Sequence, residues 1–381
     1  MELNIQLFTG GCRKPTDLDV AQVMEKLRRI LKRTRISNGL IGWNINTDVT
    51  EIIKLLKDAG AGVYLWLPVF SELDGLADFS PIVSACGGAL VNYDRGNGET
   101  FNFCCPARPD NVDKVIGIFE KYYDNGSYDG VFIDKVRFPS FAGGKDAVYS
   151  CYCDYCRSRY DLPDPLELDD GDSQKKNENI NPLGLTGYTD MRYSADGAHK
   201  KLFDYKGAAV FNSLSRLCAY FRGRGLKIGM DLFAPFLSYF VGQDYRRLAP
   251  LADFIKPMFY NMTNAPAGLP FEISAYATAF GGCADMIEAR RKFLIGAAGY
   301  GDPGFIAREV SGICEIIKTS RLNTKLYAGV EINYSDISPV TRAYIEQSVR
   351  NVGKADGIVA SWDLNTTPVS HIDYLLNSLA P

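Results

Sequence analysis

Histidine is scarce in this sequence, with two residues in 381. His199 lies in or near a polar segment and His371 in the expected last helix, so a Ser/His/Asp triad or a histidine-ligated catalytic metal has little to build on. No apolar run approaches the roughly 18 residues of a membrane span. No run of five or more Lys or Arg occurs and the net charge is −3, which argues against a nucleic acid or an anionic membrane as the main partner. These absences favour a small neutral molecule or a sugar as the binding partner.

A targeting signal is also missing from the start of the chain. The segment MELNIQLFTG has no basic region followed by an apolar stretch of signal-peptide length. The ten cysteines are dilute outside one cluster, which suits a reducing compartment better than a small disulfide-stabilised secreted domain. We therefore expect a cytoplasmic protein, and the sequence leaves assembly into a homo-oligomer open.

Strand-like and helix-like segments alternate along the chain. Apolar, β-rich runs are expected at 4–10, 39–45, 62–70, 130–140, 226–235, 253–261, 325–334 and 357–364. Helical periodicity is expected at 17–35, 48–60, 111–126, 211–225 and 244–252, in a region ending near 296, and at 341–355 and 370–380. Eight such units predict an α/β protein, a single (β/α)8 TIM barrel over residues 1–381. An open doubly wound sheet is the alternative, and the lack of a GxGxxG or GxxxxGKS/T turn after the first strand disfavours it.

The alternation pauses after the fourth strand. Residues 140–200 hold a cysteine-rich segment and then the stretch 166–187, which is polar and poor in large apolar side chains. A connection of this length and composition is typical of a surface excursion rather than a second core. We therefore interpret 140–200 as an insertion after strand 4 of the barrel.

Polar and aromatic residues gather where the expected strands end. In a TIM barrel the active site is built from these carboxyl ends, and neither histidine lies at one of them. Acid and base work therefore falls to carboxylates, as in glycoside hydrolysis, and aromatic rings suit the apolar faces of a sugar. The strand ends carry Thr9, Trp43, Asn44, Asn46, Trp66, Glu72, Asp134, Lys135, Arg137, Asp231, Tyr260, Asn261, Glu331, Asn333, Trp362 and Asp363.

The segment CYCDYC places Cys151, Cys153 and Cys156 within six residues. Thiolates at this spacing can converge on one tetrahedral zinc, and a closed structural site needs a fourth. Cys105, which precedes a proline, is the preferred fourth ligand, and Cys104 is the alternative. A four-sulfur site has no open position for water, so the zinc would anchor loops rather than activate a nucleophile. Free thiols, or a disulfide between Cys104 or Cys105 and one of these three cysteines, are the other interpretations.

The pair of motifs CCPARPDNV and CYCDYCRSRY resembles the zinc-containing beta-galactosidases of glycoside hydrolase family 42. These enzymes carry a cysteine before proline and then a CxCxxC group after the fourth barrel strand. The resemblance covers about a hundred residues and implies that the zinc ligands are Cys105, Cys151, Cys153 and Cys156.

A second resemblance is to barrel glycosidases with an Asp-x-x-Arg-Phe-Pro signature, here DKVRFP at 134–139. In their clan the acid/base lies on the fourth strand and the nucleophile on the seventh. The resemblance implies that Glu331 is the nucleophile and that the fourth strand holds the acid/base. At that strand the galactosidases have an Asn-Glu pair, whereas this chain has Asp134 and Lys135.

The resulting hypothesis is an exo-acting glycoside hydrolase for an oligosaccharide or glycoside. Glu331 and Asp134 flank the bond, with Asp231 as the alternate partner. A Schiff base on Lys135 or Lys256, as in an aldolase or isomerase, is a second possibility, and a non-catalytic sugar-binding barrel is a third. The residues expected to bind the sugar are Trp43, Asn46, Arg137, Tyr260, Asn261, Trp362 and Asp363.

Overall fold

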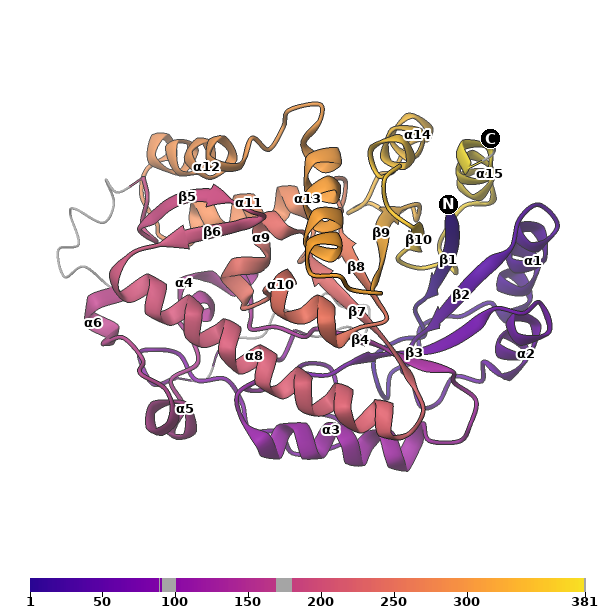
Figure 1. Ribbon diagram of the computed structural model, residues 1–381, viewed down its shortest axis with the longest axis horizontal. Coiled ribbons are helices and arrows are strands. Elements are labelled where there is room, and N and C mark those ends of the chain that lie inside the picture. The colour runs from indigo at the N-terminus through magenta and orange to yellow at the C-terminus, as the bar shows by residue number, and fades with distance from the viewer. Residues whose placement is uncertain (89, 91–100, 169–179, 380–381) are drawn as a thin grey trace.

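The computed structural model describes residues 1–88, 90, 101–168 and 180–379. Parallel strands close into one barrel in the order β1-β10-β9-β8-β7-β4-β3-β2, so the predicted (β/α)8 fold is confirmed (Figure 1). The barrel strands are β1 (Glu2–Leu7), β2 (Ile36–Ile41), β3 (Gly62–Pro68), β4 (Gly130–Asp134), β7 (Lys227–Phe233), β8 (Phe254–Met258), β9 (Lys325–Glu331) and β10 (Gly357–Ser361).

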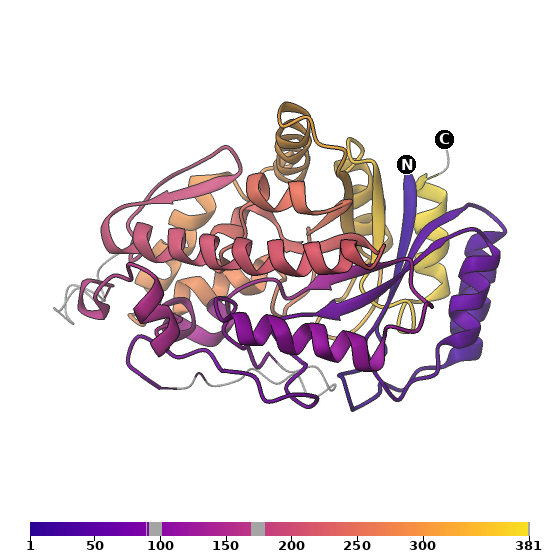
Figure 2. The ribbon, with the colours of Figure 1, turned by 60° about the horizontal axis from the view of Figure 1, so that its bottom comes forward.

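The barrel strands are mostly apolar because helices cover the outside of the barrel and side chains fill its inside. Every residue of β4 and of β10 is buried. Pairing of β1 with β10 closes the barrel, with Asn4 beside Val359. The two ends of the chain therefore lie near each other, as Figures 1 and 2 show.

Amphipathic helices form the outer ring. Asp19 caps the first of them, because its side chain accepts a hydrogen bond from the backbone N–H of Gln22 at 2.9 Å. Pro109 occupies the first turn of the third, where no backbone donor is needed. The ring helices are α1 (Val20–Leu31), α2 (Thr50–Asp58), α3 (Pro109–Tyr122), α8 (Gly197–Gly223), α10 (Tyr245–Leu248), α13 (Phe305–Thr319), α14 (Arg342–Asn351) and α15 (Val369–Leu379).

Two helices differ from their sequence predictions. Helix α8 begins at Gly197 rather than at 211, because buried Leu202, Phe203 and Val210 extend its apolar side by several turns. It lies beside α3 in Figures 1 and 2. The connection after β8 holds three helices, α11 (Leu269–Thr278), α12 (Ala284–Ala298) and α13, where the periodicity predicts one region ending near 296. The last of the three, α13, packs against β9.

The segment between β4 and α8 is built from short elements. Part of the polar stretch 166–187, residues 169–179, lies outside the described residues. The end of the stretch 166–187 belongs to the first strand of a hairpin that the sequence pattern did not predict. On the second strand, the buried Tyr193 donates to the backbone carbonyl of Leu294 in α12 at 3.1 Å. The hairpin thus packs against α12 (Figure 1). The elements of this segment are η1 (Phe141–Gly143), α4 (Gly144–Val148), α5 (Asp154–Arg159), α6 (Pro165–Leu168), β5 (Leu185–Thr189) and β6 (Arg192–Ala195).

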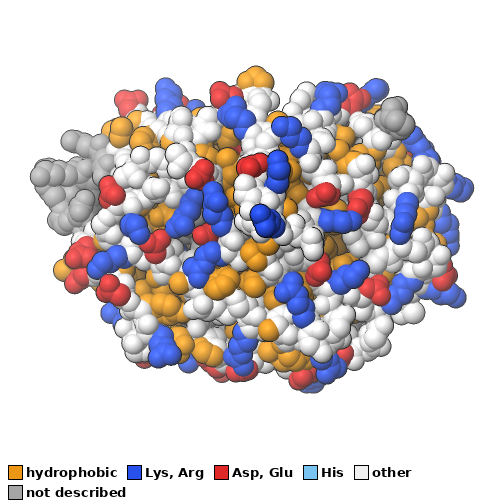
Figure 3. Space-filling model, viewed as in Figure 1, with side chains coloured by type: hydrophobic (Ala, Val, Ile, Leu, Met, Phe, Trp, Pro, Cys, Tyr) orange, Lys and Arg blue, Asp and Glu red, His pale blue; other side chains and the backbone are white. Residues whose placement is uncertain are grey.

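Three further short elements follow β7: α9 (Pro235–Ser238), η2 (Tyr239–Val241) and η3 (Ala249–Leu251). Within the described ranges, no helix combines the length and the apolar character needed to cross a membrane. On the face in Figure 3, Lys and Arg side chains are interspersed with Asp and Glu.

Candidate active site

A pocket opens at the carboxyl ends of the barrel strands, with about 590 Å³ of space not filled by atoms. Five of the predicted catalytic and sugar-binding residues line it: Asp134, Arg137, Asp231, Tyr260 and Trp362. The other lining residues are Gln6, Phe8, Trp66, Phe101, Lys135, Phe233, Met258, Thr263, Pro266 and Ala267. The barrel thus brings two carboxyl groups, two cations and several aromatic rings to one hollow.

Asp134 is the last residue of β4 and is 8% exposed. The register pairs it with Pro68, the last residue of β3, which places Trp66 of β3 within reach. The indole Nε1–H of Trp66 donates to Oδ2 of Asp134 at 2.9 Å, and the backbone N–H of Lys135 donates to Oδ1. Each oxygen keeps a further lone pair, so the carboxyl group is fixed in orientation and can still accept a proton.

Asp231 lies on β7 at the floor of the pocket, in register with Lys256 of β8. Its Oδ2 accepts from Lys256 Nζ at 2.8 Å, whereas Oδ1 has no partner among the described residues. Burial raises the pKa of Asp231 to about 7, and Asp134 acts in the same direction, although Lys256 and Arg137 oppose them. Asp231 is therefore a buried carboxyl group with a raised pKa, and its Oδ1 accepts no hydrogen bond from the described residues.

The two cations of the pocket wall are held by different partners. Lys135 pairs with Glu72, both less than 6% exposed, and its ammonium lies 4.2 Å from the centre of the Phe101 ring. Arg137 lies between the rings of Phe103 and Phe233, at 4.6 and 4.5 Å from their centres. Aromatic faces attract a desolvated cation and keep its orientation. Arg137 therefore presents a fixed guanidinium to the pocket.

Glu331, the predicted nucleophile, ends β9 but is absent from the pocket lining. Its Oε2 accepts from the backbone N–H groups of Asn261 at 2.7 Å and Met262 at 3.0 Å, and from the Tyr344 hydroxyl. Its Oε1 accepts from the hydroxyls of Thr263 at 2.6 Å and Ser338 at 3.4 Å. These donors use the capacity of both oxygens, so Glu331 holds the loop after β8 in place.

Four predicted sugar-binding residues also lie away from the pocket. Trp43 is fully buried, with its ring 5.0 Å from that of Trp66, and so belongs to the core. Asn46 is exposed and donates to the backbone carbonyl of Arg13 at 2.9 Å.

Asn261 is exposed and accepts from the Tyr300 hydroxyl. Asp363 is buried and accepts from the backbone N–H groups of Phe8 at 3.3 Å and Asn365 at 3.0 Å. Burial raises the pKa of Asp363 to about 6. Both residues follow a barrel strand, but their hydrogen bonds serve the loops.

Several pocket residues were missed because they lie inside strands or in a loop without a motif. Gln6 lies within β1, away from the strand end. The one sequence signal that could have identified it is a polar residue at an inward-facing position of a strand. Asn4, two residues earlier, is likewise buried and polar. Phe101 comes from the long connection after β3, whose path no periodicity predicts.

The four predicted metal ligands come together. The sulfur atoms of Cys105, Cys151, Cys153 and Cys156 all lie within 4.8 Å of one another, and all four residues are buried free thiols. Cys156 Sγ is 3.5 Å from the sulfurs of both Cys105 and Cys153. Four sulfurs bound at about 2.3 Å around a tetrahedral zinc would be roughly 3.8 Å apart. The cluster could therefore hold a metal ion.

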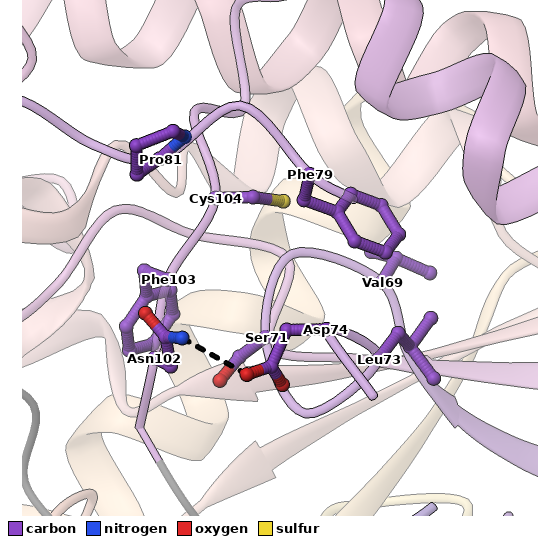
Figure 4. A pocket seen from close by; sticks show the side chains of 9 residues that line it. All are labelled: Val69, Ser71, Leu73, Asp74, Phe79, Pro81, Asn102, Phe103 and Cys104. Carbon is purple, nitrogen blue, oxygen red and sulfur yellow. Dashed lines mark hydrogen bonds between the residues drawn. The ribbon is translucent and has the colours of Figure 1, made fainter. Parts of the chain in front are cut away.

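Cys104, the alternative ligand, faces away from this cluster. Its side chain lines a second hollow, beside Val69 and Phe79 and near the hydrogen bond between Asn102 and Asp74 (Figure 4). That hollow has about 310 Å³ of unfilled space. Phe103 lines this hollow, and its ring also contacts Arg137 of the larger pocket.

No protein-family model matches the chain, and no curated protein sequence matches it either. Solved structures do resemble it. A beta-galactosidase from the psychrophilic Marinomonas ef1 has a TM-score of 0.56 at 13% identity, over 99% of this chain and 58% of that one. The catalytic domain of the beta-amylase from Paenibacillus polymyxa has a TM-score of 0.53 at 11% identity, over 100% and 99%. The PgaB (BpsB) glycoside hydrolase domain from Bordetella bronchiseptica has a TM-score of 0.50 at 13% identity, over 91% and 88%. At such identities the likeness establishes the barrel fold alone.

Proposed function

We propose that this chain is a glycoside hydrolase that uses Asp134 and Asp231 as its carboxyl pair. The observation that carries the proposal is that both groups line one pocket whose walls include Trp66, Tyr260 and Trp362. Two carboxyl groups in one pocket are the equipment of glycosidic bond cleavage, and aromatic walls suit sugar rings. That the similar solved structures include glycoside hydrolases supports the proposal as an analogy.

The environments of the two groups suggest their roles. Asp231 is the general acid, since burial raises its pKa to about 7 and Oδ1 is free to give a proton to the leaving oxygen. Asp134, oriented by Trp66, either attacks the anomeric carbon or takes a proton from the attacking water. Asp231 replaces Glu331 in the pair because the oxygens of Glu331 are occupied by donors from its own loops.

The remaining pocket groups would bind the sugar. Arg137 and Lys135 offer donors to hydroxyl oxygens, and the rings of Phe101 and Trp362 offer apolar faces. The pocket sits at the mouth of a barrel whose interior is filled with side chains, so a sugar chain cannot pass through it along the barrel axis. We therefore propose exo-acting cleavage of an oligosaccharide or glycoside.

We also propose a structural zinc on Cys105, Cys151, Cys153 and Cys156. The fit rests on four buried thiols with convergent sulfurs. The zinc would join the segment after β3, which carries Cys105, to the segment after β4. No step of the reaction involves it.

The experiment for the hydrolase is a screen of aryl glycosides and natural oligosaccharides. On an identified substrate, Asp134→Asn and Asp231→Asn should each lower kcat/KM by about 100-fold or more, with an unchanged circular dichroism spectrum. Glu331→Gln is the matched control and should retain turnover at a temperature where it is folded. Near-normal turnover by either Asn variant would refute the pair.

A Schiff-base enzyme is the second candidate, because Lys135 lines the pocket. Its ammonium is paired with Glu72, and Lys256 is fully buried and donates to three acceptors, which favours ion pairs over nucleophilic amines. Borohydride trapping with carbonyl substrates separates the two: a covalent adduct on either lysine would replace the hydrolase proposal. A non-catalytic sugar-binding barrel would bind an oligosaccharide without increasing its reducing ends.

A further inference from the structure

We propose that Gln6 binds the substrate at the floor of the pocket, where its amide N–H donates to a hydroxyl oxygen of the sugar. This inference rests on the proposed function, since it assigns a binding contact within the same pocket. It adds a residue that neither the strand-end pattern nor the family resemblance points to.

The first observation is a buried donor without an acceptor. Gln6 lines the pocket and is 0% exposed, and its Nε2 finds no partner in the part of the chain that the structure describes. A buried amide N–H without a partner costs free energy, so such a group in a pocket marks the place of a ligand oxygen or a water molecule. A water that satisfies this donor in the free protein would leave when the sugar hydroxyl takes its place.

The second observation fixes which end of the Gln6 amide is occupied by a protein group. Lys256 Nζ lies 3.0 Å from Oε1 of Gln6, and an ammonium group can only donate. Lys256 is itself held by Asp231 at 2.8 Å and by the Tyr260 hydroxyl at 2.6 Å. Three acceptors thus take the three protons of one ammonium. Because Lys256 donates to Oε1, the NH2 group is the end of this pocket-lining amide that has no partner among the described residues.

A comparison along the same strand supports this assignment. Asn4 precedes Gln6 by two residues, so both side chains point to the same face of β1. The amide of Asn4 is paired on both sides, since Nδ2 donates to the Ile358 carbonyl at 2.9 Å and Oδ1 accepts from Asn38 at 2.7 Å. Protein groups therefore satisfy the amide of Asn4, whereas the Nε2 of Gln6 is left for a ligand.

The test measures binding first, so that it does not depend on turnover. Methyl pyranosides of glucose, galactose, mannose and N-acetylglucosamine are titrated into the full chain by calorimetry. The monodeoxy analogues of the sugar that binds are then compared in the wild type and in Gln6→Met. We expect Gln6→Met to weaken the parent sugar about tenfold, which is the loss of one hydrogen bond. One deoxy analogue should show no further loss, because its missing hydroxyl is the one that Gln6 binds.

Two further variants complete the design. Gln6→Asn keeps the amide but withdraws it by one methylene, and it serves if the Met variant fails to fold. Asn4→Ser is the control: it should change thermal stability and keep the wild-type order of affinities among the deoxy analogues. If Gln6→Met weakened the binding of the parent sugar and of every deoxy analogue by the same factor, the role of Gln6 would be structural and the inference would be overturned. A wild type that binds the sugar but hydrolyses no glycoside would overturn the proposed function alone, and a wild type that binds no sugar would overturn both.

Discussion

Asp231 shows how one side chain is prepared by its neighbours. It is flanked by Lys256 and Arg137, which favour its ionised form, and by Asp134, which disfavours it. Desolvation outweighs the two cations, so the pKa rises to about 7. The same group would be an ordinary ionised carboxylate at the surface of the protein.

The proposed role of Asp231 predicts the pH dependence of hydrolysis. An acid with a pKa near 7 is protonated below that pH, so kcat/KM should fall tenfold per pH unit well above it. Lys256→Met removes a cation that lowers this pKa, and the alkaline limb should therefore move to higher pH. A pH–rate profile of both proteins checks the direction. A limb that moves to lower pH, or does not move, would contradict the assignment.

For Glu331 we predict an effect on stability rather than on catalysis. Its carboxylate accepts from five groups, including two backbone N–H groups. In Glu331→Gln an NH2 group must face one of these donors, and the unfolding free energy should fall by about 1–3 kcal/mol. Denaturant unfolding measures this loss. Activity lost with stability unchanged would return Glu331 to the nucleophile role that the family resemblance implies.

At the scale of elements, the cysteine cluster joins segments that are distant in sequence. Cys105 lies in the segment that follows β3, and the other three cysteines lie between β4 and α8. Tyr205 of α8 adds a hydrogen bond from its hydroxyl to Cys156 Sγ at 2.9 Å. A metal here would hold two segments and a helix together without touching the pocket residues.

The cluster predicts one zinc per chain, measured by mass spectrometry of the purified protein. Cys105→Ser should lose the metal and lower the melting temperature, whereas Cys104→Ser should keep the metal. The two cysteines are adjacent and both are buried, so they form a matched pair. Loss of metal from the Cys104 variant alone would exchange their roles.

At the scale of the whole molecule, buried carboxyl groups make folding pH-dependent. Glu309 on α13 is buried, accepts from Tyr188 of the β5–β6 hairpin at 2.8 Å, and has its pKa raised by burial to about 7. The folded state then holds a proton that the unfolded chain has released. The contribution of such a group to stability is complete below the unfolded pKa of 4.5 and declines as pH rises toward 7.

Glu309→Gln should remove this pH dependence and leave the pocket intact. Because 2.5 pKa units correspond to about 3 kcal/mol, the variant should gain stability over the wild type between pH 4.5 and 7 by roughly that amount. Unfolding curves of both proteins at pH 4.5, 6 and 8 measure the difference. Surface carboxylates with lowered pKa values act in both proteins and cancel. A difference that stays constant with pH would contradict the prediction.

The repeating pattern of apolar runs was sufficient to predict the barrel, because each strand and helix carries its own periodicity. The CxCxxC spacing likewise predicted that these cysteines come together. Boundaries were less certain: the start of α8 and the presence of α13 depend on which faces become buried, and helical periodicity alone does not say where packing stops.

The candidate site was likewise predicted only in part from the sequence. The sequence by itself determined which residues end the strands, because strand ends follow from local pattern and turn chemistry. It could not determine which of these side chains meet. Tertiary structure decided that Asp134 and Asp231 share a pocket with Gln6, whereas Glu331 and Trp43 do not. The physical reason is that a strand-end side chain can face either the barrel axis or a neighbouring loop, and that choice depends on the hydrogen-bond partners that the closed barrel supplies.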